Sequence, residues 1–149
     1  MSSILKHPKK DFLKMHKAGK LAAQVLDYIN DFVEPDITTN YLNDLCHQFI
    51  IENNAIPAPL NYKGFPKSTC ISVNHVVCHG IPGDKILKNG DILNIDVTVI
   101  LDGWYGDTSR MFYVGKPSAK AKILTKITYE CLMIGLSLIH ISEPTRLST

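Results

Sequence analysis

Two N-terminal segments show the periodicity of amphipathic helices. Across residues 9–32, apolar residues recur in steps of three and four, which is typical of a helix with one buried face. Pro35 is expected to end this helix. A second helix is expected to begin after Thr38 or Thr39 as its N-cap and to end at residues 53–54. The predicted apolar faces are Met15, Ala18, Ala22, Val25, Leu26, Ile29 and Phe32, and Leu42, Leu45, Cys46, Phe49 and Ile50.

The central part of the chain changes to the pattern of short strands and loops. Residues 60–68 are expected to form a loop, and residues 69–73 a strand. A turn at residues 74–75 should lead into a second short strand over residues 76–79. Residues 91–101 should then form a long strand, because β-branched and aliphatic residues alternate with polar ones there.

An Asp102-Gly103 dipeptide joins two β-prone runs and predicts a hairpin. A two-residue type I′ turn needs positive φ at both central positions, which Asp-Gly tolerates well. The register of the two strands follows from this turn. It pairs Leu101 with Trp104, Val99 with Gly106 and Thr98 with Asp107.

The predicted hairpin gathers polar side chains on one face. Because side chains alternate with period two, Asn94, Asp96 and Thr98 share a face with Asp107 and Ser109. The Cβ atoms of Asp96 and Asp107 would lie roughly 5–8 Å apart. Two bare carboxylates there would repel each other and raise the pKa of one, and a divalent cation would remove the repulsion. The alternative is a solvated face with two unrelated acids.

A third helix is expected from Pro117, which would lie near its first turn. The order of two helices, a β-rich centre and a helix predicts an α+β fold, with helices packed on one face of an antiparallel-rich sheet. The length of 149 residues suits a single domain. The apolar stripe of the third helix would consist of Ile123, Leu124, Ile127, Cys131 and Ile134.

Composition limits the classes of function. The chain has 16 basic and 14 acidic residues, and a net charge of +2 does not point to nucleic acid, DNA included, or to an anionic membrane. Its longest apolar run, residues 131–141, is too short for a membrane span. Four cysteines without C-x-x-C spacing and an N-terminus without a signal-peptide core predict free thiols and a cytoplasmic location.

Six lysines recur along the first predicted helix. We expect them to form its solvated face, with contact to ribosomal RNA as the alternative. They are Lys6, Lys9, Lys10, Lys14, Lys17 and Lys20.

His75 and His79 have the i, i+4 spacing that on a helix would place both imidazoles on one metal. The surrounding sequence predicts strand and turn, where they would be roughly 13 Å apart, so at most one belongs to a site. His79 is favoured because it precedes Gly80, where the backbone can approach a ligand closely. Tyr62, Phe65 and Cys70 would be either ordinary core or the lining of a small pocket for a thioether side chain. 

Two segments carry a resemblance to a known family. LNYKGFPKSTCISVNHVVCHGIP (residues 60–82) and GDILNIDVTVILDGWYGDTSRMF (residues 90–112) resemble type I methionine aminopeptidase of the bacterial form. The resemblance runs from about Lys6 to about Leu136. It implies the first half of a pita-bread fold, in which two pseudo-symmetric α/β halves enclose a dinuclear metal site. We therefore expect residues 1–136 to be the N-terminal half of such a catalytic domain.

The resemblance also implies a role for each candidate residue. Asp96 matches a metal ligand that binds through both oxygens, and Asp107 matches the ligand that bridges two divalent ions. These ions would be Co, Mn, Fe or Zn. Thr98 matches a position that steadies the carboxylates.

The remaining matches concern the substrate. His79 matches the histidine that contacts the scissile peptide bond. The pocket for the methionine side chain matches Tyr62, Phe65 and Cys70. The implied function is removal of the initiator methionine from nascent polypeptides, by an enzyme that is monomeric when full length and able to associate with the ribosome.

The family completes its site with one histidine and two glutamates from a second half. After Asp107 this chain offers Glu130, Glu143 and His140, none in a matching motif. Residues 137–149 do not match the family, so we expect a fragment that is inactive alone. The alternatives are a non-catalytic pita-bread binding module, which the retained Asp96, Asp107 and His79 disfavour, and an Xaa-Pro-type aminopeptidase, which the V-C-H-G-I-P segment disfavours.

Overall fold

The structure is a computed structural model that describes residues 6–139. His140, Glu143 and most of the predicted non-matching tail lie outside these residues. The chain falls into two compact units, Met1–Lys116 and Pro117–Thr149. The elements are α1 (Lys9–Ile29), the 3-10 turn η1 (Asn30–Phe32), α2 (Thr39–Glu52), β1 (Ile56–Pro57), the 3-10 turn η2 (Tyr62–Gly64), β2 (Cys70–Val73), β3 (Ile92–Leu101), β4 (Trp104–Tyr113) and α3 (Ala119–Ile139).

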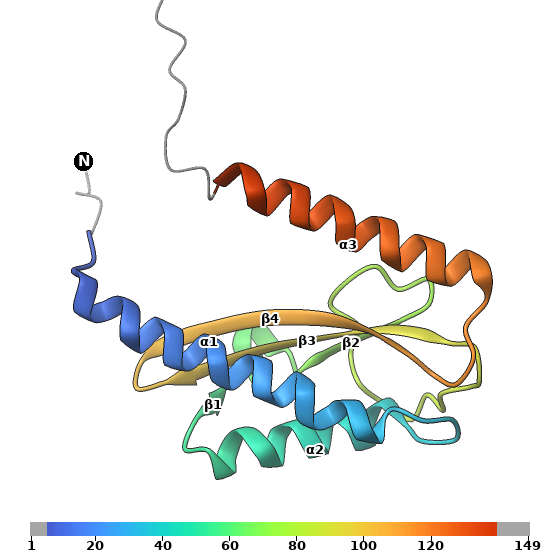
Figure 1. Ribbon diagram of the computed structural model, residues 1–149. Helices are drawn as coiled ribbons and strands as arrows, with labels where there is room; N and C mark the ends of the chain where they lie inside the picture. The colour runs from blue at the N-terminus through green and yellow to red at the C-terminus, as the bar shows by residue number, and fades with distance from the viewer. Residues whose placement is uncertain (1–5, 140–149) are drawn as a thin grey trace, which may run out of the picture. The chain divides into compact units, whose positions relative to one another are not determined.

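The first unit is built on an antiparallel sheet with β3 at its centre (Figure 1). Strand β4 pairs with one edge of β3 along the whole length of β3. Strands β2 and β1 pair with the other edge of β3. The predicted hairpin is confirmed, because Asp102 and Gly103 have φ values of 51° and 80°. The predicted register is confirmed as well: Leu101 pairs with Trp104, Val99 with Gly106 and Thr98 with Asp107.

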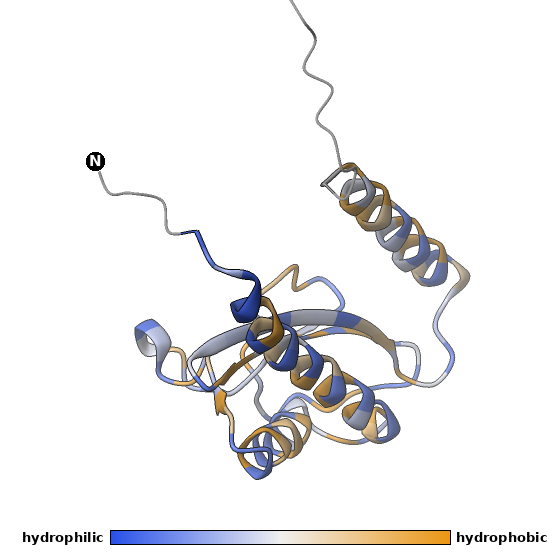
Figure 2. Ribbon diagram, turned by 60° about the vertical axis from the view of Figure 1, so that its left-hand side comes forward, coloured by the Kyte–Doolittle hydropathy of each residue, from blue (hydrophilic) through white to orange (hydrophobic). Residues whose placement is uncertain are grey.

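Helices α1 and α2 cover one face of this sheet, as the order of elements predicted (Figure 1). Alternate residues of β3 point into the interface with the helices and are fully buried. The apolar stripe of α1 faces them, and its other faces carry polar residues (Figure 2). The buried positions are Leu93, Ile95, Val97 and Val99 on β3, and Ala18, Leu21, Ala22, Val25, Leu26 and Ile29 on α1.

The predicted helices are present, with small differences in their buried faces. Thr38 caps α2, since its hydroxyl oxygen accepts a hydrogen bond from the backbone N–H of Tyr41 at 3.1 Å. Met15 was predicted to be buried but is 51% exposed. The reason is that the turns of α1 before Ala18 bury no side chain in the described structure. Leu21, which the predicted stripe omitted, belongs to the core.

The prediction of a strand over residues 76–79 was wrong. This segment forms a turn and an irregular loop, in which Val77 is 91% exposed. His79 has a φ of 53°, in the left-handed region that no regular strand uses. The loop lies beside β2, where the backbone N–H of Ile71 donates to the carbonyl of Gly80, but the positive φ of His79 turns the backbone away from a strand, so the β propensity of the apolar residues is not realised.

Helix α3 belongs to the second unit and begins where Pro117 predicted. The hydroxyl oxygen of Ser118 accepts a hydrogen bond from the backbone N–H of Ala121 at 3.1 Å, which caps the helix. The stripe predicted for burial is exposed, for example at Ile127 and Ile134. Within residues 6–139, no helix combines the length and the apolarity needed to cross a bilayer.

Gly106 allows α1 to lie directly against β4. A Cβ atom at this position would be 2.2 Å from the backbone carbonyl carbon and oxygen of Ala18, a distance that only a backbone shift could relieve. We expect Gly106→Ala to lower the free energy of unfolding by about 1–3 kcal/mol, the usual cost of overpacking. Urea unfolding followed by circular dichroism measures the change.

Gly19→Ala is the matched control for this substitution. A Cβ at Gly19 meets no atom within 4 Å, so alanine should raise the stability of α1 slightly through its better helix propensity. Equal stability of Gly106→Ala and the parent chain would contradict the close approach.

Candidate metal centre

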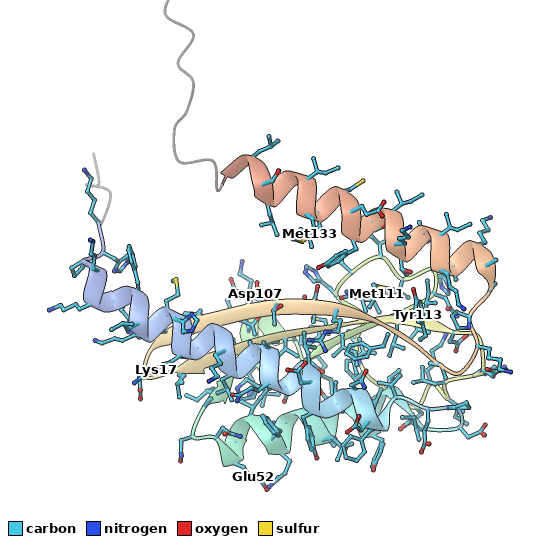
Figure 3. The ribbon with its side chains drawn as sticks, viewed as in Figure 1. Lys17, Glu52, Asp107, Met111, Tyr113 and Met133 are labelled. Atoms are coloured by element: carbon cyan, nitrogen blue, oxygen red, sulfur yellow. The ribbon has the colours of Figure 1, made fainter. Side chains whose placement is uncertain are left out.

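The second face of the β3–β4 ribbon carries the two predicted acidic residues. Asp96 and Thr98 alternate with the buried residues of β3, and Asp107 lies opposite Thr98 on β4. The Thr98 hydroxyl donates a hydrogen bond to Oδ1 of Asp107 at 3.0 Å. Figure 3 shows Asp107 on the side of the sheet away from α2. The hairpin register therefore places both carboxylates on one face, as the turn predicted.

Strand β2 adds Cys70 beside Asp96, because these two residues are register partners. The start of β2 is held by Asn43, a buried residue of α2. Its Oδ1 accepts hydrogen bonds from the backbone N–H groups of Ser68 at 3.0 Å and Thr69 at 3.2 Å. This anchoring fixes the strand on the core, and with it the position of Cys70 on the open face.

His79 reaches the same region from a loop that lies against β2. The backbone N–H of Ile71 donates to the carbonyl of Gly80 at 2.8 Å, and the N–H of Gly80 donates to the Ser72 hydroxyl at 3.1 Å. A Cβ at Gly80 would lie 2.2 Å from the carbonyl oxygen of Ile71. The sequence predicted that Gly80 admits a ligand, but its close approach in this structure is to the backbone of β2.

A groove of about 850 Å³ brings all the candidate residues together. The seven predicted residues that line it are Tyr62, Phe65, Cys70, His79, Asp96, Thr98 and Asp107. His75, the other histidine of the i, i+4 pair, does not line it. Sequence reasoning missed Tyr105, although its alternation with Asp107 along β4 could have indicated it. Lys63 and Ile81 also line the groove, and their loop positions gave no comparable signal.

Burial and repulsion destabilise the charge of Asp96. Burial is the larger cause that raises the pKa of this carboxyl group, the negative charge of Asp107 raises it further, and His79 lowers it. The sequence predicted such a rise from the pairing of two acids. Burial, together with Asp96, Cys78 and Asp107, also raises the pKa of Cys70 to about 11, so its thiol stays neutral at pH 7.

The donor set suits a divalent cation. The oxygens of Asp96 and Asp107 are charged donors at one end of the groove, and a cation would offset the repulsion between them. The imidazole of His79 lines the same groove, where it can hydrogen-bond a bound ligand. Among residues 6–139, no group of three or more His, Cys, Asp or Glu side chains is placed to hold an ion. The described residues therefore offer part of a coordination sphere.

Comparison with known proteins identifies the family of this chain. The pattern of metallopeptidase family M24 matches residues 13–146. The chain belongs to this family.

The curated relatives are methionine aminopeptidases. The chain is 68% identical over 134 residues to the methionine aminopeptidase of Rickettsia prowazekii, and 51% identical over 141 residues to that of Escherichia coli K12. These alignments cover 90% and 93% of the chain, but 52% and 53% of the relatives. The chain thus spans about half the length of the curated proteins it matches.

Solved structures give the same result. The crystal structure of the Rickettsia prowazekii methionine aminopeptidase matches with a TM-score of 0.87 at 69% identity, covering 88% of this chain and 53% of that one. A prolidase from Pyrococcus horikoshii matches with a TM-score of 0.69 at 20% identity, covering 83% of this chain and 34% of that one, which shows a shared fold. The α+β architecture is that of the pita-bread proteins, as the resemblance implied.

The raised pKa of Asp96 predicts how the free energy of unfolding changes with pH. The folded protein holds its proton to higher pH than the unfolded chain, so stability falls as pH rises from the ordinary pKa of 3.8 through the raised value. In the presence of a chelator, Asp96→Asn should therefore raise the free energy of unfolding at pH 7 and not below pH 3.8. Urea unfolding at both pH values measures this.

Asp102→Asn is the control, because it also removes one carboxylate and Asn-Gly suits the same turn. The assignment of a destabilised charge would be wrong if both variants gained the same stability at pH 7.

Proposed function

We propose that this chain is the N-terminal half of a metal-dependent aminopeptidase that removes the initiator methionine from nascent proteins. The observation that carries the proposal is the shared face of Asp96 and Asp107, with His79 lining the same groove. The 68% identity to a methionine aminopeptidase supports the choice of methionine over proline-directed substrates.

Asp96 would bind one divalent ion through both carboxylate oxygens, and Asp107 would bridge two ions. The hydrogen bond from Thr98 leaves Oδ1 of Asp107 in a fixed orientation, which favours a bridging geometry. Co, Mn, Fe and Zn all suit such ligands. When bound, these ions supply a water of lowered pKa and polarise the carbonyl of the first peptide bond.

The protein's own groups would place the peptide. His79 would donate a hydrogen bond to the scissile peptide as its carbonyl oxygen becomes negative. Tyr62, Phe65 and Cys70 would receive the methionine side chain, since aromatic edges and a neutral thiol contact a thioether favourably. The carboxylates of Asp96 and Asp107 would hold the ions to which the free α-amino group binds.

At this site the described residues supply only two metal ligands, the carboxylates of Asp96 and Asp107, which would hold a transition metal weakly. We therefore propose that residues 1–136 form one half of the catalytic domain and that this chain is inactive alone. The complete enzyme would be a cytoplasmic monomer that meets nascent N-termini near the ribosome.

The decisive assay is release of methionine from Met-Ala-Ser with added Co or Mn. We expect no turnover by this chain and turnover by a version extended with its native downstream sequence. Asp96→Ala in the extended protein should abolish turnover, because one ion loses the two oxygen donors that Asp96 supplies. Asp102→Asn, at the exposed hairpin turn, should leave turnover unchanged.

Other outcomes separate the alternatives. Cleavage of Xaa-Pro peptides without cleavage of Met-Ala-Ser would replace the proposal with a proline-directed aminopeptidase. An extended protein that binds no metal and cleaves neither peptide would be a non-catalytic binding module.

Thr98 should tune metal affinity without being a ligand. Thr98→Val keeps the shape of the side chain but removes the hydrogen bond to Asp107, so we expect Mn affinity of the extended protein to fall about 10–100-fold. Isothermal titration with Mn measures this, and Thr98→Ser should restore affinity because it keeps the hydroxyl. Equal affinity of the valine variant and the parent would exclude the positioning role.

A further inference from the structure

Positive charge is concentrated in one short segment of the chain. Residues 6–20 contain six lysines and one aspartate, a formal charge of +5, while the remaining residues together carry −3. A net charge of +2 for the whole chain hides this separation. A local excess of this kind creates a positive potential over one part of the surface.

The structure arranges five of these lysines on one side of α1. We call them the lysine row. At about 100° per residue they fall within an arc of about 140°, and they extend about 16 Å along the helix axis. All five are exposed. Figure 2 shows polar colours on these first turns, and Figure 3 labels Lys17 among them. The lysine row is Lys9, Lys10, Lys14, Lys17 and Lys20.

The row is not neutralised within the described chain. The ion pairs of residues 6–139 include no lysine of the row. Asp11, the one acid in the segment, lies 3.3 Å from His7. Asp102 borders a small cavity with Lys14 and Lys17 but forms no ion pair with either.

Trp104 fixes one end of this surface to the hairpin. The ammonium group of Lys14 lies 5.8 Å from the centre of the indole ring, and the ring of His7 meets the same indole edge-on at 5.2 Å. Lys14 is thereby held over a rigid strand end, which lowers the entropy it would lose on binding a partner.

We propose that the lysine row docks on the phosphodiester backbone of structured RNA. Five unpaired ammonium groups over about 16 Å match a surface with closely spaced negative charge. The narrow major groove of an A-form duplex brings the phosphates of both strands near each other, within reach of one lysine-bearing face. Across residues 9–20 there is no arginine, asparagine or glutamine, so the row contacts backbone and reads no base sequence.

An anionic membrane fits this surface less well. A basic helix that lies on a bilayer inserts its apolar face into the lipid. From Ala18 onward the apolar stripe of α1 is buried against the sheet. In the first turns Phe12, Leu13 and Met15 are exposed, but at about 100° per residue Leu13 falls inside the arc of the lysine row, so apolar and basic side chains do not form two opposite faces there. The docking of RNA does not depend on peptidase activity, so failure of one proposal leaves the other standing.

The test measures binding of this chain to a fluorescent RNA duplex of about 16 base pairs. Affinity should fall with salt between about 50 and about 200 mM, with a slope of log K against log salt of about −4.5 for five phosphate contacts. The double variant Lys14→Glu, Lys17→Glu should bind at least about tenfold more weakly and reduce the slope by about two units. Its circular dichroism spectrum checks that α1 remains folded.

The double variant Lys85→Glu, Lys88→Glu is the matched control. It makes the same change in net charge at two exposed lysines outside α1, and it should bind RNA like the parent. Equal weakening by both double variants would show an effect of net charge alone and overturn the proposal. The proposal would also be overturned if a DNA duplex bound the parent chain as tightly as the RNA does. Competition with the RNA by vesicles of phosphatidylcholine and phosphatidylserine would overturn it as well.

Discussion

The alternation of side chains along β3 is the constraint on which the rest of the structure depends. Hydrogen bonds along both edges hold this strand straight, so every second side chain enters the core and the others face the groove. Ile95 and Val97 pack beneath α1 and α2, while Asp96 between them is directed to the opposite side. A slip of one residue would bury the carboxylate and expose the core. The packing that stabilises the first unit therefore also directs the carboxylate of Asp96 into the groove.

Two close backbone contacts then determine what surrounds the acids. Gly106 lets α1 lie against β4, and Gly80 lets the loop that bears His79 lie against β2. Asn43 ties the start of β2 to α2 through two backbone N–H groups. Each contact lies outside the groove, yet each positions a wall of it. The groove is thus a consequence of backbone packing more than of contacts among its own side chains.

The two faces of the first unit serve different purposes. One face of the sheet is closed by helices and supplies stability, and the other presents Asp96, Thr98 and Asp107 to a groove that remains open. The destabilised charge of Asp96 is what a cation would relieve, since burial without a partner costs free energy. The chain belongs to metallopeptidase family M24, a family that implies divalent metal cofactors, and this donor set suits such an ion.

Local sequence determined the helices, the hairpin turn and the register that places Thr98 opposite Asp107, because turn chemistry and period-two alternation act between near neighbours. It did not determine the loop at His79, for which β-prone residues predicted a strand. The positive φ of His79 and the close contact of Gly80 with β2 arise from tertiary packing, which local propensity does not report. Local sequence also gave no sign that Cys70 would lie beside Asp96. That contact joins residues far apart in the chain, and only the packing of β2 on the edge of β3 decides it.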